Sequence, residues 1–194
     1  MLNKKIAIFG YGGHAREVAC QIGGDITFFV DDEYSNDFTK PISTFNANKY
    51  KIIIGVGNCL NRENIVKSLP KNTEYLTFIH PTAQILSKDV IIGEGSFIGA
   101  NSIITCNIKI GKHAILNRGN HIGHDSIIGD FFSAMPGSIV SGDVIIGDRV
   151  YLGSNSSIRE KIKICDDVII GLNSGIVKDI QYKGTYVGEN KKIK

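Results

Sequence analysis

Residues 92–127 read IGEGSF IGANSI ITCNIK IGKHAI LNRGNH IGHDSI, six consecutive blocks that each begin with an aliphatic side chain. The same spacing continues to Ile176, so that every sixth residue from Ile92 onwards is aliphatic. Glycine directly follows this anchor residue in eight of the blocks, and a small or β-branched residue usually stands four positions after it. Leu86 extends the register one step toward the N-terminus.

A strict period of six excludes an amphipathic helix, because an apolar stripe with that spacing would rotate around the helix axis. The period is typical of a solenoid, in which one aliphatic side chain of each short strand points inward and a small residue permits each corner. Three strands make one triangular coil, so residues 92–181 predict a β-helix of about five coils. Chance periodicity in a β-sandwich is the alternative, and fifteen anchors without a break argue against it.

The chain before the repeat has a different pattern, in which strands alternate with helices. Apolar runs predict strands at 5–9, 26–30, 51–56 and 75–79, and helical spacing predicts helices at 14–22 and 61–69. This alternation indicates a parallel sheet. We therefore expect an α/β domain, a Rossmann-like half, at 1–78, followed by a β-helix domain with a C-terminal tail at 79–194.

Composition and charge indicate an ordinary globular protein. Charged residues make up 21% of the chain and the net charge is +3, which is too small to indicate a nucleic-acid partner. The apolar run at 5–9 is too short for a signal peptide or a membrane span. None of the four cysteines forms a Cys-x-x-Cys pair, so we expect buried thiols in a reducing, cytoplasmic compartment. These cysteines are Cys20, Cys59, Cys106 and Cys165.

A glycine-rich turn follows the first predicted strand. Gly10-x-Gly12-x-x-Ala15 matches the dinucleotide-binding fingerprint, and Asp31 follows at a suitable distance. Only about 78 residues precede the repeat, too few for the two mononucleotide halves that NAD requires, but half a fold can hold one diphosphate at a helix N-terminus. We therefore predict a nucleotide-diphosphate-sugar site. The expected contacts are Gly12, Gly13 and His14 for the diphosphate, Asp31 or Asp32 for the base or ribose, and, as weaker candidates, Gly57, Asn58 and Arg62.

The pair His124-Asp125 has the composition of a general base with an orienting carboxylate. One coil below His124 stands Cys106 and one coil above it stands Gly142. Both residues are small, so the histidine would have room beside it, which favours a reaction site. A surface histidine at a β-helix corner is an equally open interpretation of the spacing alone, because a lone His-Asp pair is a weak signal.

Over nearly its whole length the sequence resembles hexapeptide-repeat sugar acetyltransferases of two types, the bacillosamine-pathway nucleotide-aminosugar N-acetyltransferases and the sialic acid O-acetyltransferases. The shared segments are GYGGHA at 10–15, VDD at 30–32, GVGN at 55–58, IHPTA at 79–83 and the run 117–125. The resemblance implies a left-handed parallel β-helix, a homotrimer, and acetyl-CoA in the groove between neighbouring prisms. It also implies that His124 is the catalytic base, that Asp125 is its partner, and that the sugar reaches a neighbouring subunit's histidine.

Two positions depart from the pattern of that family. Many relatives carry a second histidine near acetyl-CoA where this chain has Ser133, which could still donate a hydrogen bond. The usual ending Val-Gly-x-Pro-Ala-Lys reads VGENKK at 187–192, which alters the expected path of the tail beside the coenzyme. The candidate acetyl-CoA contacts are Ser133, Gly142, Gly153, Gly171 and Lys178.

Three histidines within twelve residues raise the alternative of a zinc site like that of the γ-class carbonic anhydrases. Zinc needs ligands that converge on one point, whereas His113, His121 and His124 fall in different columns of an eighteen-residue coil. We therefore expect no metal. His113 is expected to be a solvated corner residue, and His121 to be structural or a neighbour of the substrate.

Together these features predict an acetyl-CoA-dependent N-acetyltransferase that acts on a nucleotide-linked 4-amino-4,6-dideoxysugar for surface polysaccharide or protein glycosylation. Sugar O-acetylation of the sialic acid type is the first alternative. A non-catalytic β-helix that binds a sugar nucleotide is the second. The sequence distinguishes neither the nucleotide nor the sugar.

Overall fold

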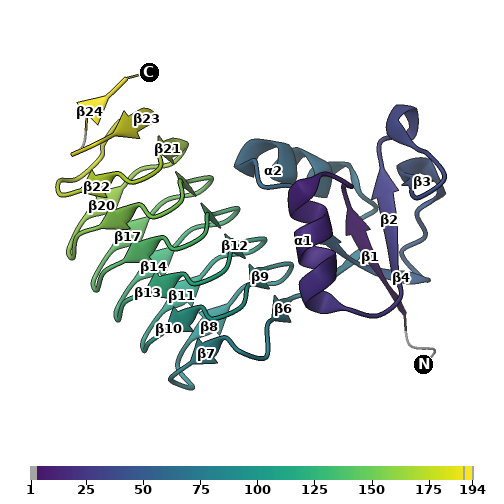
Figure 1. Ribbon diagram of the computed structural model, residues 1–194, viewed down its shortest axis with the longest axis horizontal. Coiled ribbons are helices and arrows are strands. Elements are labelled where there is room, and N and C mark those ends of the chain that lie inside the picture. Colours follow the sequence, from purple (N-terminus) through teal and green to yellow (C-terminus); the bar gives the residue numbers. More distant parts are fainter. Residues whose placement is uncertain (1–3, 190, 194) are drawn as a thin grey trace.

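Two architectures meet in this chain, a small α/β domain and a triangular β-helix (Figure 1). The computed structural model describes residues 4–189 and 191–193. Residues 1–3 of the first predicted domain, and Asn190 and Lys194 of the predicted tail, lie outside the described residues. Helices α1 (Gly13–Ile22) and α2 (Cys59–Ser68) lie between the sheet of the α/β domain and the β-helix.

The sheet of the α/β domain is parallel throughout and has the strand order β3-β2-β1-β4-β5. The predicted parallel sheet is therefore confirmed. Its strands are β1 (Lys5–Phe9), β2 (Ile26–Val30), β3 (Lys40–Pro41), β4 (Tyr50–Ile54) and β5 (Glu74–Tyr75), with short 3-10 helices at Asp32–Tyr34 and Ile42–Thr44.

Several predicted elements of this domain differ from the structure, among them the strand predicted at 51–56, which is β4 at Tyr50–Ile54. The second helix begins at Cys59 rather than at residue 61, because the Asn58 side chain caps it by accepting a hydrogen bond from the Asn61 N–H at 2.9 Å. The single strand predicted at 75–79 is wrong. Its first residues belong to β5, which pairs with β4, and its last residues form β6 (Phe78–Ile79), which pairs with the β-helix. We keep the proposed division of the domains near residue 78.

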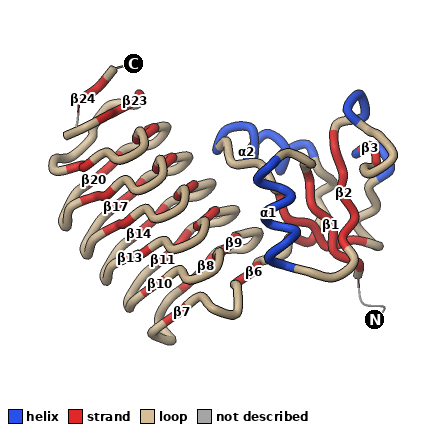
Figure 2. The backbone as a smooth tube through the Cα atoms, in the orientation of Figure 1, coloured by secondary structure: helices blue, strands red, loops and turns tan. Residues whose placement is uncertain are grey.

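The β-helix is built from three parallel sheets that form the three faces of a prism (Figure 2). We call them the first, second and junction faces, the last being covered by the α/β domain. The first face contains β7 (Gln84–Ile85), β10 (Ile103–Ile104), β13 (His121–Ile122), β16 (Ile139–Val140), β19 (Ser157–Ile158) and β22 (Gly175–Ile176). The second face contains β8 (Ile91–Ile92), β11 (Lys109–Ile110), β14 (Ile127–Ile128), β17 (Ile145–Ile146) and β20 (Lys163–Ile164). The junction face contains β6, β9 (Phe97–Ile98), β12 (Ile115–Leu116), β15 (Ser133–Ala134), β18 (Tyr151–Leu152), β21 (Val168–Ile170), β23 (Gly184–Val187) and the antiparallel β24 (Lys191–Lys192).

The anchor residues form the core that the period of six predicts. From Ile98 to Ile176 every anchor is buried in one continuous cluster. The extension of the register to Leu86 is wrong, because Leu86 is 60% exposed and Ile85 packs against the core instead. The first coil contains one extra residue: Gln84 pairs with Ile103, whereas later strands pair with strands eighteen residues away until β21, which pairs with β23 at a spacing of sixteen.

The glycine after each anchor does not form the corner of the prism, as the sequence predicts, but has another role. The glycine after each anchor is required by close packing of coils, since a Cβ on Gly111 would lie 2.6 Å from the Gly129 carbonyl. The left-handed backbone conformation stands two residues later, at every sixth position from Gly95 to Asn173. Asn and Asp occupy half of these positions, as their tolerance of positive φ permits.

The cysteines and the helices bear on the expected location. Cys59 is buried, but Cys20 and Cys106 are exposed, so the prediction of four buried thiols is wrong; all four thiols are free. Neither α1 nor α2, nor any other helix in the described part of the chain, has the length and apolar character needed to cross a bilayer.

Candidate active site

His124 and Asp125 stand at a corner between the first and second faces of the prism. His124 Nδ1 lies 2.7 Å from Asp125 Oδ2. The carboxylate therefore favours the proton on Nδ1 and leaves the Nε2 lone pair free, as a general base requires. Asp125 holds this position through the left-handed backbone conformation of its corner, with φ of 61°.

Asp125 is oriented by the coil below. The Asn107 side-chain amide donates to Asp125 Oδ1 at 2.7 Å, so both carboxylate oxygens have partners. The hydrogen bonds from Asn107 and then from His124 lower the pKa of Asp125 below its ordinary value. Asp125 is therefore a carboxylate at neutral pH and can stabilise the imidazolium that forms during base catalysis. The sequence analysis did not predict this role of Asn107.

Gly142, one coil above, supports the ring of His124. A Cβ built on Gly142 would lie 2.5 Å from His124 Nε2, so only glycine leaves room for the ring in this position. Within the described residues the Gly142 N–H has no hydrogen-bond acceptor. An N–H without an acceptor in the described chain is a donor that could meet a developing oxyanion.

Substituting Gly142 with alanine is expected to lower the turnover number about tenfold or more, because the new methyl group would displace the His124 ring from its place beside Asp125. The backbone of Gly142 does not have positive φ, so we expect the melting temperature to change little. Thiol release from acetyl-CoA and thermal unfolding measure the two effects. Gly175→Ala is the control, since a Cβ there meets nothing within 4 Å. Unchanged turnover in Gly142→Ala would contradict this placement of His124.

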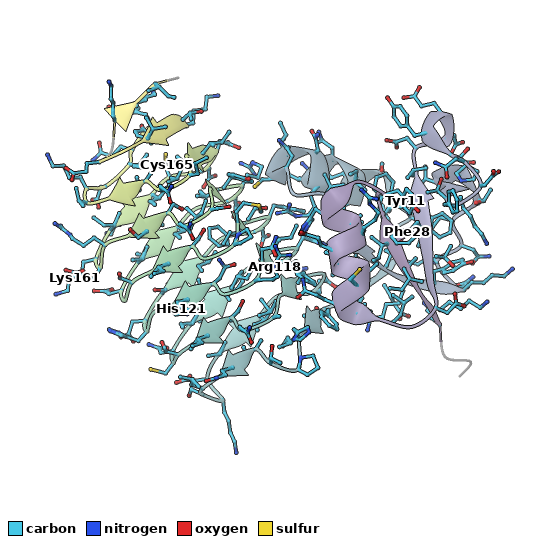
Figure 3. The ribbon with its side chains drawn as sticks, viewed as in Figure 1. Tyr11, Phe28, Arg118, His121, Lys161 and Cys165 are labelled. Atoms are coloured by element: carbon cyan, nitrogen blue, oxygen red, sulfur yellow. The ribbon has the colours of Figure 1, made fainter. Side chains whose placement is uncertain are left out.

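A cavity of about 930 Å³ lies between the α/β domain and the junction face. Four of the predicted nucleotide-sugar residues line it, namely Gly13, His14, Gly57 and Asn58. Figure 3 shows Arg118 in the space between the prism and α1, while His121 lies on another face. The sequence reasoning missed most of the wall that the β-helix supplies, including Asn117, Arg118, Met135, Pro136, Arg149, Tyr151, Asp167 and Ile169.

His14 is an unpaired polar group at this cavity. Its Nε2 is buried and has no hydrogen-bond partner in the described structure. Burial, followed by the positive charge of Arg62, lowers the pKa of His14, which keeps the ring neutral at pH 7. A neutral imidazole with one free ring nitrogen can bind a polar ligand group there.

The N-terminus of α1 is open for a ligand. A Cβ on Gly12 or Gly13 would meet nothing within 4 Å, so packing within the chain does not require glycine there. No side chain caps this helix end. Asp31 and Asp32, at the end of β2, do not line the cavity; Asp32 Oδ1 accepts a hydrogen bond from the Ser43 N–H at 3.0 Å, which lowers the pKa of Asp32.

Arg62 joins the two domains rather than binding phosphate. It is 1% exposed, and its guanidinium donates to the carbonyls of His113 (2.8 Å), Phe131 (2.6 Å) and Phe132 (3.0 Å) across the junction. It also donates to Val56 and Gly57 in its own domain and to the Ser133 hydroxyl. The weaker prediction that Arg62 contacts the nucleotide is therefore wrong, since its donors are used within the chain.

Ser133 also belongs to the junction. It is fully buried, and its hydroxyl donates to the Gly57 carbonyl at 2.8 Å while it accepts from Arg62. A side chain enclosed in this way has no access to acetyl-CoA, so the structure argues against its predicted role.

His113 is not the solvated corner residue that the sequence predicts. It does occupy a corner, with φ of 54°, but it is 4% exposed and its ring packs between Tyr75 and Phe131. Its Nδ1 is buried without a hydrogen-bond partner. Burial lowers the pKa of His113 to about 4.

Acidification is expected to destabilise the protein through His113. Below the ordinary pKa of about 6.5, His113 binds a proton in the unfolded chain, whereas in the folded chain it stays neutral until the pH falls to about 4. The free energy of unfolding should therefore decrease across this interval by up to about 3 kcal/mol. Urea unfolding between pH 7 and pH 4 measures the slope. His113→Asn, which tolerates positive φ, should reduce that slope, whereas exposed His121→Asn should not. An unchanged slope in His113→Asn would refute the assignment.

The remaining predicted coenzyme residues lie on the upper coils. Gly153 and Gly171 have no room for a Cβ, which would lie 2.5 Å from the Leu172 nitrogen and 2.8 Å from Val187 Cγ1 respectively. Lys178 is an exposed residue just after β22. Among residues 4–189 and 191–193, no three His, Cys, Asp or Glu side chains gather as metal ligands would.

Family models match both parts of the chain. The PglD N-terminal domain matches residues 5–69, the hexapeptide repeat of succinyl-transferase matches 89–129, and the bacterial transferase hexapeptide (six repeats) matches 125–160. The chain is also 26% identical over 149 residues to GDP-perosamine N-acetyltransferase of Escherichia coli O157:H7. The matched region covers 68% of this chain and 67% of that protein.

Solved structures agree over nearly the whole length. The acetyltransferase domain of PglB from Neisseria gonorrhoeae FA1090 is 27% identical, with a TM-score of 0.88 over 98% of this chain and 100% of that one. Its complex with acetyl coenzyme A superposes with a TM-score of 0.87 over the same shares, again at 27% identity.

The β-helix is a left-handed parallel β-helix whose repeats are similar to the hexapeptide repeats of bacterial transferases. More particularly, the N-terminal part is similar to the PglD N-terminal domain, and the whole chain resembles the bacillosamine-pathway type of sugar acetyltransferase. The predicted fold class and family resemblance are confirmed.

Proposed function

We propose that this protein is an acetyl-CoA-dependent N-acetyltransferase for a nucleotide-linked 4-amino-4,6-dideoxysugar, with His124 as general base. The observation that carries the proposal is the pair His124–Asp125, with Nδ1 on the carboxylate and the ring packed where Gly142 has no Cβ. The similarity to a GDP-perosamine N-acetyltransferase and to a domain solved with acetyl-CoA supports this substrate and co-substrate.

The geometry suggests how the reaction proceeds. The sugar amine attacks the acetyl carbonyl of the thioester, and His124 Nε2 takes a proton from the nitrogen as the new C–N bond forms. The oxyanion of the tetrahedral intermediate accepts a hydrogen bond from the Gly142 N–H. The C–S bond then breaks, and the coenzyme leaves as a thiolate that the imidazolium can protonate. Asp125 stabilises the imidazolium in between.

We further propose a homotrimer in which the sugar reaches the histidine of a neighbouring subunit. His124 does not line the cavity that contains Gly13, His14 and Asn58, so the two halves of the site are separate within one chain. The His124 side chain is 61% exposed, and a second subunit that covered it would exclude water from the reaction. The exposed apolar residues nearby on the first and second faces are suited to such contact. They are Ile127, Ile139 and Ile145.

Acetyl-CoA and nucleotide sugars are both metabolites of the cytoplasm, and we propose that compartment for the reaction. The four free thiols are compatible with its reducing conditions.

The test of the proposal is an acetyl-transfer assay. Purified protein is mixed with acetyl-CoA and with UDP-, dTDP- or GDP-linked 4-amino-4,6-dideoxysugars, and thiol release is followed. The matched control replaces the 4-amino group of each sugar with a hydroxyl group. Release with an amino sugar alone supports N-acetylation, whereas release with the hydroxyl sugar or with sialic acid would favour O-acetylation. No release with any acceptor, in protein that binds acetyl-CoA, would overturn the proposal and favour a non-catalytic binding protein.

A further inference from the structure

An aromatic group that the mechanism does not use lies beside the glycine-rich turn. The rings of Tyr11 and Phe38 are parallel to within 5°, with centroids 6.3 Å apart. Phe28 packs edge-on against Tyr11 at 5.0 Å, and Figure 3 shows these two rings together at the end of the sheet. Phe38 is 74% exposed, so a large part of its aromatic surface faces solvent.

The loop that carries Phe38 is held in place by hydrogen bonds. Asn36 Oδ1 accepts from the Phe38 N–H at 2.9 Å, and Thr39 Oγ1 accepts from the Asn36 N–H at 3.0 Å. Thr39 itself is buried, which fixes the loop to the domain. These hydrogen bonds therefore hold the Phe38 ring in a defined orientation, although the ring itself is not buried in the core.

The turn that carries Tyr11 leads directly to the other features that could bind the ligand. Tyr11 lies between Gly10 and Gly12 in the turn that leads from β1 into α1. The open helix N-terminus at Gly12 and Gly13 follows directly, and Gly13 and His14 line the interdomain cavity. Aromatic rings, helix N-terminus and cavity thus succeed one another along the surface of the α/β domain.

We propose that the Tyr11–Phe38 pair is the stacking platform for the nucleobase of the nucleotide sugar. The inference rests on the proposed function and deepens it. The base stacks on the exposed face of Phe38, the diphosphate lies at the N-terminus of α1, and the sugar extends into the cavity. Every nucleobase has a π-face, so stacking gives affinity for the nucleotide without selecting one base.

The surrounding charges fit this occupant. The guanidinium of Arg16 lies 5.9 Å from the centroid of the Tyr11 ring and belongs to the first turns of α1, where a diphosphate would need positive charge. The carboxylates of Asp31 and Glu33 are on the segment that connects β2 to the Phe38 loop and could accept N–H groups from the edge of a base. A purely apolar partner would leave these charges unused.

The chain offers a direct optical test, because it contains no tryptophan. In Phe38→Trp the new indole would be the only one, and a base stacked on it should quench its fluorescence. We expect saturable quenching by UDP, dTDP or GDP, and none by inorganic pyrophosphate or ribose 5-phosphate, which lack a base. Tyr182→Trp is the matched control: Tyr182 is also exposed, but it lies in the C-terminal part of the β-helix, so the same nucleotides should not quench it.

A kinetic comparison provides the second measurement. Phe38→Ala should raise KM for the nucleotide sugar about tenfold, the magnitude of one lost base–aromatic stack, while kcat at saturation and KM for acetyl-CoA stay within about twofold. Tyr34→Ala, an equally exposed aromatic residue nearby, should change neither. A merely structural role for Phe38 would instead lower stability and affect both substrates.

Several outcomes would overturn the inference. One is the absence of quenching by all three nucleotides in Phe38→Trp, and another is quenching by acetyl-CoA at lower concentration than by the nucleotides. An unchanged KM in Phe38→Ala would do so as well, while leaving the proposed acetyl transfer intact. Conversely, if no amino sugar is acetylated but the nucleotides quench Phe38→Trp, the proposed function fails and the base platform stands.

Discussion

Replacing His124 with asparagine is expected to lower kcat for acetyl transfer by about 10²- to 10⁴-fold, the usual contribution of a positioned general base. Asparagine can still interact with Asp125 but has no basic nitrogen at the position of Nε2. KM for both substrates should change little, because the ring has no assigned part in ground-state binding. Steady-state thiol release with the acceptor that the acetyl-transfer assay selects provides the measurement, with the folding of the variant verified by thermal unfolding.

A matched variant tests whether the loss of activity is specific to His124. His121→Asn is the matched control, since it removes an exposed histidine from the neighbouring strand β13. A kcat for His124→Asn within tenfold of the wild-type value would remove His124 from its role as base, whatever the identity of the sugar.

Replacing Arg62 with methionine is expected to lower the free energy of unfolding by about 3–5 kcal/mol, the cost typical of breaking a buried charged network. The aliphatic chain would still fill the junction, but the carbonyls of His113, Phe131 and Phe132 would lose their donor while remaining buried. Burial also lowers the pKa of Arg62 to about 10, yet the group stays charged at neutral pH. Chemical denaturation monitored by circular dichroism measures the loss.

Arg159→Met is the control for Arg62→Met, because Arg159 is exposed on the prism and its loss should change stability by less than about 0.5 kcal/mol. Arg62→Lys should restore only part of the stability, since one ammonium cannot reach acceptors on both sides of the junction. If Arg62→Met unfolded like the wild type but bound nucleotide sugar poorly, Arg62 would be a ligand residue and its assignment to the junction would be incorrect.

Much of the fold could be predicted from the sequence because it depends on local repetition. The spacing of the aliphatic anchors alone predicts that they are buried. The His124-Asp125 pair lies within one corner, so its geometry depends only on adjacent residues and on the neighbouring coils. The parallel sheet follows in the same way from alternating segments. The extra residue before Ile91 escaped notice because a single insertion does not disturb the later register.

Several of the errors concern the junction between the domains. Arg62, His113 and Ser133 come from segments up to 71 residues apart, and each is buried only because the α/β domain docks on the junction face. No periodicity within either domain encodes that docking. Phe38 was missed for a related reason: it stands in an irregular loop with no motif, and its meaning comes from the ring of Tyr11 opposite it.

Within the prism, each coil pairs only with the coils directly above and below it, because the strands of the central coils pair with partners eighteen residues away. The irregular first coil shows that a change of length stays local, since Ile91 and Lys109 are already back in the common spacing. Inserting one further eighteen-residue coil after Ile164 would therefore raise the prism by about 4.8 Å and leave both His124 and the junction at Arg62 in place. The height of the prism can therefore change without a change in the chemistry at its corner. Evolution can adjust that height to a long co-substrate while the site at the corner stays the same.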